Sequence, residues 1–153
     1  MKKLAICFLL ICGAIGCSGD AENRDYEFSL ENDTLEMRDG VRLAVTYYRP
    51  SAKRVGETFP VIMEMLPYRK DDFFALGDYE YGAYFAKRGY VVARVDVRGT
   101  GGSEGGIPVS EYSEAEISDA EELIAKLSRK SWSNGNVGMY GLSWSAFNSL
   151  MTA

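Results

Sequence analysis

The chain has 153 residues, of which 46% are hydrophobic and 25% are charged, a globular composition with enough length for one domain with a hydrophobic core. Its net charge of −5 argues against nucleic acid as a partner, because phosphate binding needs clustered Lys and Arg side chains. The sequence contains no histidine, so any imidazole base or ligand must come from outside these residues.

The N-terminus has the features of an export signal. Two lysines precede a 13-residue apolar run, Leu4–Gly16, which is short for a membrane span and typical of a signal peptide. We therefore predict a signal segment over residues 1–16 and a polar tether over residues 17–25. Cys17 follows small residues as in a bacterial lipobox, although Ala14 stands where an aliphatic residue is usual. The expected product is a lipoprotein acylated at Cys17 in the cell envelope or periplasm; ordinary cleavage and an uncleaved anchor are the alternatives.

The segment after the tether predicts a hairpin followed by a buried strand. Short alternating patterns cover Tyr26–Leu30 and Thr34–Met37, and Arg38–Gly40 has the composition of a hairpin turn. The alternation resumes over Val41–Tyr48, which predicts the second arm of the hairpin. Phe59–Leu66 is a nearly continuous apolar run, which is typical of a strand buried on both faces.

Helices and strands alternate over the rest of the chain. A helix is predicted from Asp78, a plausible N-cap, to Arg88, and a buried strand over Tyr90–Val97. A longer helix is predicted over Glu111–Arg129, with apolar residues on one face and acidic residues opposite, which is most simply a solvated face. Ser131–Asn136 is predicted to be a turn, and a third, short strand over Val137–Leu142 leads into a helix that starts at Ser145.

This order predicts an α/β fold for residues 26–153. Strands that alternate with helices are joined by right-handed crossovers and form a parallel sheet. We therefore expect a leading antiparallel hairpin and then a mostly parallel sheet with flanking helices.

A glycine-rich segment, Arg98–Gly106, follows one predicted strand and invites comparison with a dinucleotide-binding loop. That fingerprint needs a third glycine where Glu104 stands, and a helix that opens directly after the loop. Pro108 delays the helix, so the phosphate-loop interpretation fails and no cofactor is expected.

The junction at Gly141–Ser145 has the pattern of a nucleophile elbow. It lies where a predicted strand ends and a helix begins, and the tight turn needs small residues two positions before and after the nucleophile. Gly141 and Ser145 meet this need around Ser143, whereas Phe147 is too large to flank Ser145 as a nucleophile. Taken alone, the pattern equally fits a junction whose serines cap a helix.

Four segments, in this order, resemble the α/β-hydrolase family that contains cocaine esterase, the α-amino-acid ester hydrolases and the Xaa-Pro dipeptidyl peptidases. They are Met37–Leu43, Leu66–Asp71, Gly89–Gly105 and Trp132–Trp144. The third and fourth segments are the most specific, and the likeness extends over about Asn32–Ala153.

The resemblance implies an α/β-hydrolase fold and a reaction through an acyl-enzyme, with a small ester or peptide as substrate. By this resemblance Ser143 is the nucleophile, and the Tyr68 hydroxyl and the Trp144 backbone N–H form the oxyanion hole. If the resemblance is set aside, the simpler interpretation of Tyr68 is an aromatic residue of a surface loop. The resemblance also implies that Asp96 and Arg98 brace the glycine-rich loop, as an ion pair or hydrogen-bond hub, and are not catalytic.

The machinery of this family is incomplete in the sequence. In this fold the acid and the His follow the nucleophile, but ten residues follow Ser143 and none is a histidine. We therefore expect the fold to be incomplete and the chain to be inactive alone, as the N-terminal part of an exported serine hydrolase that cleaves an ester or an Xaa-Pro or amino-acyl amide bond. The alternative is a non-catalytic binding lipoprotein on the same scaffold.

Overall fold

The computed structural model of the chain describes residues 25–72 and 75–153. The predicted signal segment 1–16, Cys17 and nearly all of the predicted tether lie outside these residues. Within the described residues, no helix is both long and apolar enough to cross a membrane.

One mixed sheet organises the chain, with the strand order β1-β2-β4-β3-β5. Its strands are β1 (Phe28–Glu36), β2 (Arg42–Pro50), β3 (Phe59–Leu66), β4 (Val91–Asp96) and β5 (Ser133–Met139). The β1–β2 hairpin is antiparallel and joins β4 through a second antiparallel pair. The pairs β3–β4 and β3–β5 are parallel. The predicted α/β fold, with a leading hairpin and parallel strands after it, is confirmed.

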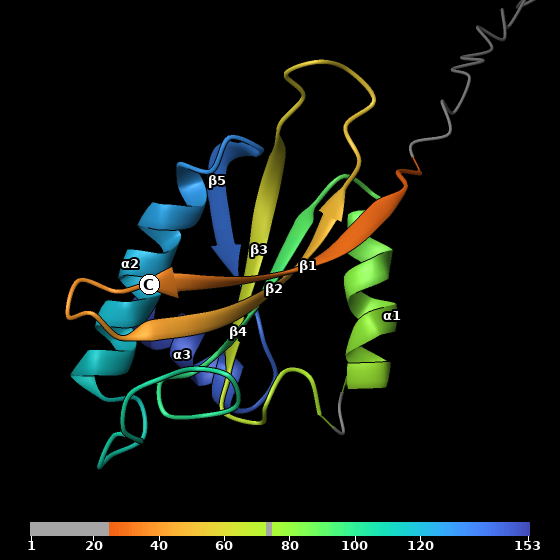
Figure 1. Cartoon of the computed structure of the whole chain (residues 1–153). Helices are drawn as coiled ribbons and strands as arrows, with labels where there is room; N and C mark the ends of the chain where they lie inside the picture. The colour runs from red at the N-terminus through yellow and green to blue at the C-terminus, as the bar shows by residue number, and fades with distance from the viewer. Residues whose placement is uncertain (1–24, 73–74) are drawn as a thin grey trace, which may run out of the picture.

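The helices cover both faces of this sheet (Figure 1). Helix α1 (Ala75–Ala86) packs on one face, whereas α2 (Glu114–Ser128) and α3 (Trp144–Thr152) lie on the other. Because both faces are covered, every residue of β4 is buried, including the charged residues Arg94 and Asp96, and the predicted buried strand is present. The carboxyl ends of β3, β4 and β5 therefore open at one edge of the sheet, where ligand sites of such folds are usually built.

The main core lies between the sheet and α2. It combines alternate side chains of the central strands with Ala120, Leu123 and Leu127 of α2, all inaccessible to solvent. A smaller cluster on the opposite face joins Tyr48, Ala86 and Val92. Fully burying an aliphatic side chain contributes about 1.5–3 kcal/mol, so the larger core contributes more stability than the smaller cluster.

Several element boundaries differ from the predictions. The two short alternating patterns before the turn form one strand, because β1 pairs with β2 along its whole length. The predicted turn before Val137 belongs to β5 from Ser133 onwards, because Ser133 pairs with Phe59 across a register shift.

Helix α1 begins at Ala75, so Asp78 lies in its first turn and is not its N-cap. Helix α2 begins at Glu114, after Ser113, whose hydroxyl caps it by accepting from the Glu116 N–H at 3.3 Å.

Candidate active site

Ser143 lies on a strained turn between β5 and α3. Its backbone has φ 55° and ψ −117°, a region that L-residues rarely adopt. A non-glycine residue held in such a region costs about 1–3 kcal/mol, and such residues cluster at functional sites. The strain turns the Ser143 side chain away from the sheet into an exposed position. The predicted elbow is therefore present as geometry as well as sequence.

The turn is tight enough to require glycine at position 141. A Cβ atom placed on Gly141 would lie 2.0 Å from the Cβ of Ser145 and 2.5 Å from its carbonyl carbon. Ser145 itself is buried, and its hydroxyl donates to Oε1 of Glu64 at 3.3 Å. Of the two elbow serines, the structure places Ser143 in solvent and Ser145 inside the protein.

The three predicted site residues meet at the carboxyl edge of the sheet. Tyr68, in the loop after β3, directs its hydroxyl to Oγ of Ser143 at 3.4 Å. Trp144 is the first residue of α3, and the first N–H groups of a helix have no acceptor within the helix. A tyrosine hydroxyl and a helical N–H beside the same serine form a pair of donors suited to a developing oxyanion.

A cavity of about 290 Å³ opens beside Ser143. Its walls combine apolar side chains with three charged side chains, Glu64, Asp78 and Arg94. The lining residues are Glu64, Leu66, Tyr68, Asp78, Arg94, Leu142, Ser143 and Ser145. The cavity can hold part of a small substrate whose reacting carbonyl lies against Ser143.

The loop that carries Tyr68 is fixed by two hydrogen bonds of the Lys70 backbone, one from its N–H and one to its carbonyl. The Lys70 N–H donates to Oδ1 of Asp96 at 2.7 Å, and the Lys70 carbonyl accepts from Nη1 of Arg94 at 3.0 Å. Asp96 also accepts from the Gly102 N–H at 2.9 Å, so the same carboxylate anchors the glycine-rich loop. This role agrees with the predicted hydrogen-bond hub at Asp96.

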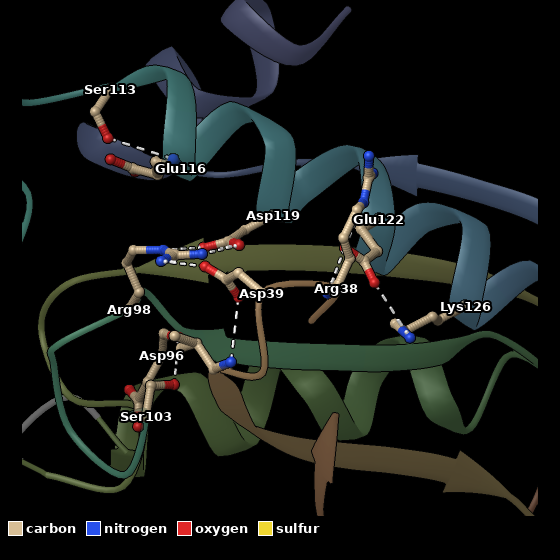
Figure 2. Close-up of polar contacts among 11 residues, drawn as sticks. Arg38, Asp39, Asp96, Arg98, Ser103, Ser113, Glu116, Asp119, Glu122 and Lys126 are labelled. Carbon is tan, nitrogen blue, oxygen red and sulfur yellow. Dashed lines mark hydrogen bonds and ion pairs between the residues drawn. The ribbon is translucent and has the colours of Figure 1, made fainter. Parts of the chain in front are cut away.

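Arg98 is not the partner of Asp96, and the ion pair suggested between them is wrong. Figure 2 shows the Arg98 guanidinium between Asp119 of α2 and Asp39 of the β1–β2 turn. Its Nε and Nη2 bind the two carboxylate oxygens of Asp119 at 2.7 and 2.6 Å, and Nη1 lies 2.9 Å from Asp39. The hydrogen bonds that Arg98 donates to Asp119 raise the pKa of Arg98 above its usual value, so Arg98 is a permanently charged brace.

The acidic face predicted for α2 is not simply solvated. Asp119 is buried against Arg98, and Glu116, also in α2, is buried against the first residues of α3. Oε1 of Glu116 accepts from the indole Nε1 of Trp144 at 2.6 Å and from Nδ2 of Asn148 at 2.8 Å. Because these partners lie about 30 residues further along the chain, the sequence pattern of α2 alone gives no sign of them. Glu116 ties the first turn of α3 to α2.

Glu64 and Arg94 are two further site residues that the sequence analysis missed. Glu64 interrupts the apolar run of β3, and Arg94 interrupts that of β4. A charged residue inside a buried strand is rare unless it is paired, and this signal could have identified both. The two residues are direct neighbours across the parallel β3–β4 pair.

Comparison with known proteins places this geometry in a family. Residues 39–153 match the family described as X-Pro dipeptidyl-peptidase (S15 family). The chain is 40% identical over 114 residues to cocaine esterase of Rhodococcus sp. (strain MB1 Bresler), which covers 74% of this chain and 19% of that protein.

Solved structures give the same result. A CocE/NonD family hydrolase from Staphylococcus aureus superposes with a TM-score of 0.70 at 31% identity, over 82% of this chain and 25% of that one. An α-amino acid ester hydrolase superposes with a TM-score of 0.65 at 26% identity, over 93% and 25% of the two chains.

The chain spans about a fifth of the length of the curated relatives that it matches, and about a quarter of these solved chains. The matched part includes Tyr68, Ser143 and the glycine-rich loop, and it confirms the resemblance predicted from the sequence. The chain belongs to the X-Pro dipeptidyl-peptidase (S15) family of serine hydrolases, and the residues it contains have an α/β-hydrolase fold.

Proposed function

We propose that this chain supplies the nucleophile and the oxyanion hole of an exported serine hydrolase that cleaves an ester, or an Xaa-Pro or amino-acyl amide bond. The observation that carries the proposal is the strained Ser143, whose exposed Oγ lies 3.4 Å from the Tyr68 hydroxyl. A non-catalytic binding protein would need neither the strain nor the facing hydroxyl. The relatives, esterases and peptidases by name, support the same reaction class.

In the proposed reaction, Ser143 Oγ attacks the substrate carbonyl carbon and gives its proton to a general base. The carbonyl oxygen becomes an oxyanion that accepts hydrogen bonds from the Tyr68 hydroxyl and the Trp144 N–H. When the tetrahedral intermediate collapses, the base returns the proton to the leaving alcohol or amine, and the acyl group stays on Ser143. Water then attacks the acyl-enzyme by the same route.

The base must come from outside these 153 residues, since none of them is a histidine, and in this fold the acid lies between the nucleophile and that histidine along the chain. Loss of the base from a serine triad lowers turnover on the order of a million-fold. We therefore propose that catalysis requires the complete hydrolase, meaning this segment together with the polypeptide that supplies the His and the acid. The 153-residue chain alone should not turn over p-nitrophenyl acetate above background.

We also propose that the protein is exported and attached to a membrane through an acylated Cys17. The support is the run of lysines, apolar residues and small residues that ends at this cysteine. Attachment at the cell envelope would give the hydrolase access to small esters or peptides outside the cytoplasm.

Steady-state hydrolysis by the complete hydrolase tests the proposed function. Ser143→Ala should abolish turnover, whereas Tyr68→Phe should lower kcat about a hundredfold or more and leave KM nearly unchanged, because an oxyanion donor acts in the transition state. Parallel assays with p-nitrophenyl acetate, an amino-acyl ester and an Xaa-Pro dipeptidyl amide identify the substrate class. Turnover that persists in Ser143→Ala would overturn the proposal.

A further inference from the structure

Glu64 and Arg94 form a largely buried ion pair in the wall of the cavity beside the nucleophile. Nε of Arg94 lies 3.2 Å from Oε2 of Glu64, and their side chains are 3% and 14% exposed respectively. Both residues lie near the carboxyl ends of their strands and line the cavity beside Ser143. The pair is therefore close to the reaction centre without touching Ser143 itself.

Glu64 contacts the elbow on both sides of the nucleophile. Oε1 accepts from the Ser145 hydroxyl at 3.3 Å, two residues after Ser143. Oε2 accepts from the Tyr140 hydroxyl at 3.3 Å, three residues before Ser143. Burial raises the pKa of Tyr140, and the negative charge of Glu64 raises it further, so the phenol stays a donor. One carboxylate thus holds the two ends of the strained turn.

Arg94 contacts the segments that carry the other half of the site. Its Nη1 donates to the Lys70 carbonyl at 3.0 Å, two residues after Tyr68. Its Nη2 lies 2.6 Å from Oδ2 of Asp78, in the first turn of α1. The planar guanidinium has enough donors in fixed directions to hold Glu64, Lys70 and Asp78 at once, which a lysine cannot do.

We infer that the Glu64–Arg94 pair is a positioning device, which sets the Ser143 elbow against the Tyr68 loop and so sets the geometry of the oxyanion hole. The inference rests on the proposed function. Through Glu64 the pair holds Tyr140 and Ser145, and through Arg94 it holds Lys70, so the chain of contacts crosses from one half of the site to the other. Positioning matters here because a misplacement of about 1 Å can lower a rate about a hundredfold.

Stability alone is a weak reason for such a pair. Burying two charges costs as much solvation as their attraction returns, and replacing a buried pair with apolar residues of similar size is often neutral or stabilising. Removing both charges together should therefore leave the fold intact while it breaks the links to the elbow and the loop. This difference separates a positioning role from a structural one.

The test measures single-turnover acylation of the complete hydrolase by p-nitrophenyl acetate. The double variant Glu64→Met with Arg94→Met should remain folded, and its acylation rate should fall about tenfold or more with KM within about twofold of the parent. Arg94→Lys keeps the positive charge but not the fork of donors, and its acylation rate should also fall about tenfold.

A matched control is available in a second buried pair. The Asp119 and Arg98 side chains are 3% and 14% exposed, and their contacts reach α2 and the β1–β2 turn. The double variant Asp119→Met with Arg98→Met removes both charges of this pair in the same way, so its folded fraction should acylate at the parent rate.

Two outcomes would overturn the inference in distinguishable ways. Acylation within about twofold of the parent in the folded double variant or in Arg94→Lys would overturn the positioning role alone. If the unaltered enzyme showed no Ser143-dependent acylation, the proposed function would fail, and the inference with it.

Discussion

Gly141 and Ser145 approach so closely across the elbow that a single added carbon at position 141 would lie 2.0 Å from the Cβ of Ser145. This contact makes the elbow a packing constraint as well as a sequence pattern. The strained backbone of Ser143 persists because the residues on either side of it have no room to relax.

Gly141→Ala should therefore lower both stability and reactivity. The added methyl group meets backbone as well as side chain, so the turn must shift, at a cost of about 1–3 kcal/mol or more. Gly138→Ala is the matched control, because a Cβ there meets nothing within 4 Å. Urea unfolding of the two variants checks the difference. Equal midpoints for both variants would show that the elbow tolerates bulk at Gly141.

Asp119→Ala should destabilise the protein strongly, by roughly 3 kcal/mol. The variant removes the carboxylate that binds Nε and Nη2 of Arg98, and these two nitrogens then stay buried without an acidic partner. Glu121→Ala, at an exposed position of the same helix, should stay within about 0.5 kcal/mol of the parent. Thermal or urea unfolding of both variants provides the comparison. A mild effect at Asp119 would mean that water or Asp39 satisfies Arg98 instead.

The hairpin should contribute stability that disappears in acid. The hydrogen bonds from Nε of Arg49, at 3.0 and 3.1 Å, hold the pKa of Glu31 below its ordinary value of 4.5. A carboxyl group whose pKa is lower in the folded state than in the unfolded state stabilises the fold at pH values above its unfolded-state pKa. This stabilisation is lost as the pH falls through the folded-state pKa. The difference in unfolding free energy between the parent and Glu31→Gln should thus shrink as pH falls below 4.5.

The control for this pH effect is Arg49→Gln. Without the guanidinium, the effect of Glu31→Gln on stability should depend much less on pH, because the largest cause of the lowered Glu31 pKa is removed and the Ser29 hydroxyl bond remains. Urea midpoints measured from pH 7 to pH 3 test both variants, and a difference that stayed constant in the parent background would refute the assignment to this pair.

Acylation of Cys17 predicts a specific mature N-terminus. Intact-mass analysis of the exported protein should show a chain that begins at Cys17 and carries acyl groups. The variant Cys17→Ala should lose the mass of the acyl groups and leave the membrane fraction. The idea fails if that variant still fractionates with membranes and has the same mass change as the parent.

The sequence predicts the sheet well where burial on both faces dictates it. The apolar run of β3 was predicted at Phe59–Leu66 and has these bounds in the structure. Prediction is poorer where partners come from elsewhere in the chain. Ser133–Asn136 has the composition of a turn but extends β5, because its pairing with β3 outweighs local preference.

The candidate site divides in the same way. Ser143 and Tyr68 were found because their motifs are local, and the structure brings them within 3.4 Å. Glu64 and Glu116 hold the elbow through partners 28 to 81 residues away, which neither periodicity nor spacing reveals. A charge inside an apolar run marks Glu64, whereas Glu116 resembles any surface glutamate of an acidic helix.

The most direct test of the account is the site at which a fluorophosphonate probe reacts with the complete hydrolase. Peptide mapping by mass spectrometry should find the adduct on Ser143, with labelling lost in Ser143→Ala and largely retained in Ser145→Ala. The 153-residue chain alone should remain unlabelled, because no residue in it takes the Ser143 proton as a histidine would. An adduct on any other residue, or labelling of the complete hydrolase that survives Ser143→Ala, would contradict the assignment of Ser143 as the nucleophile.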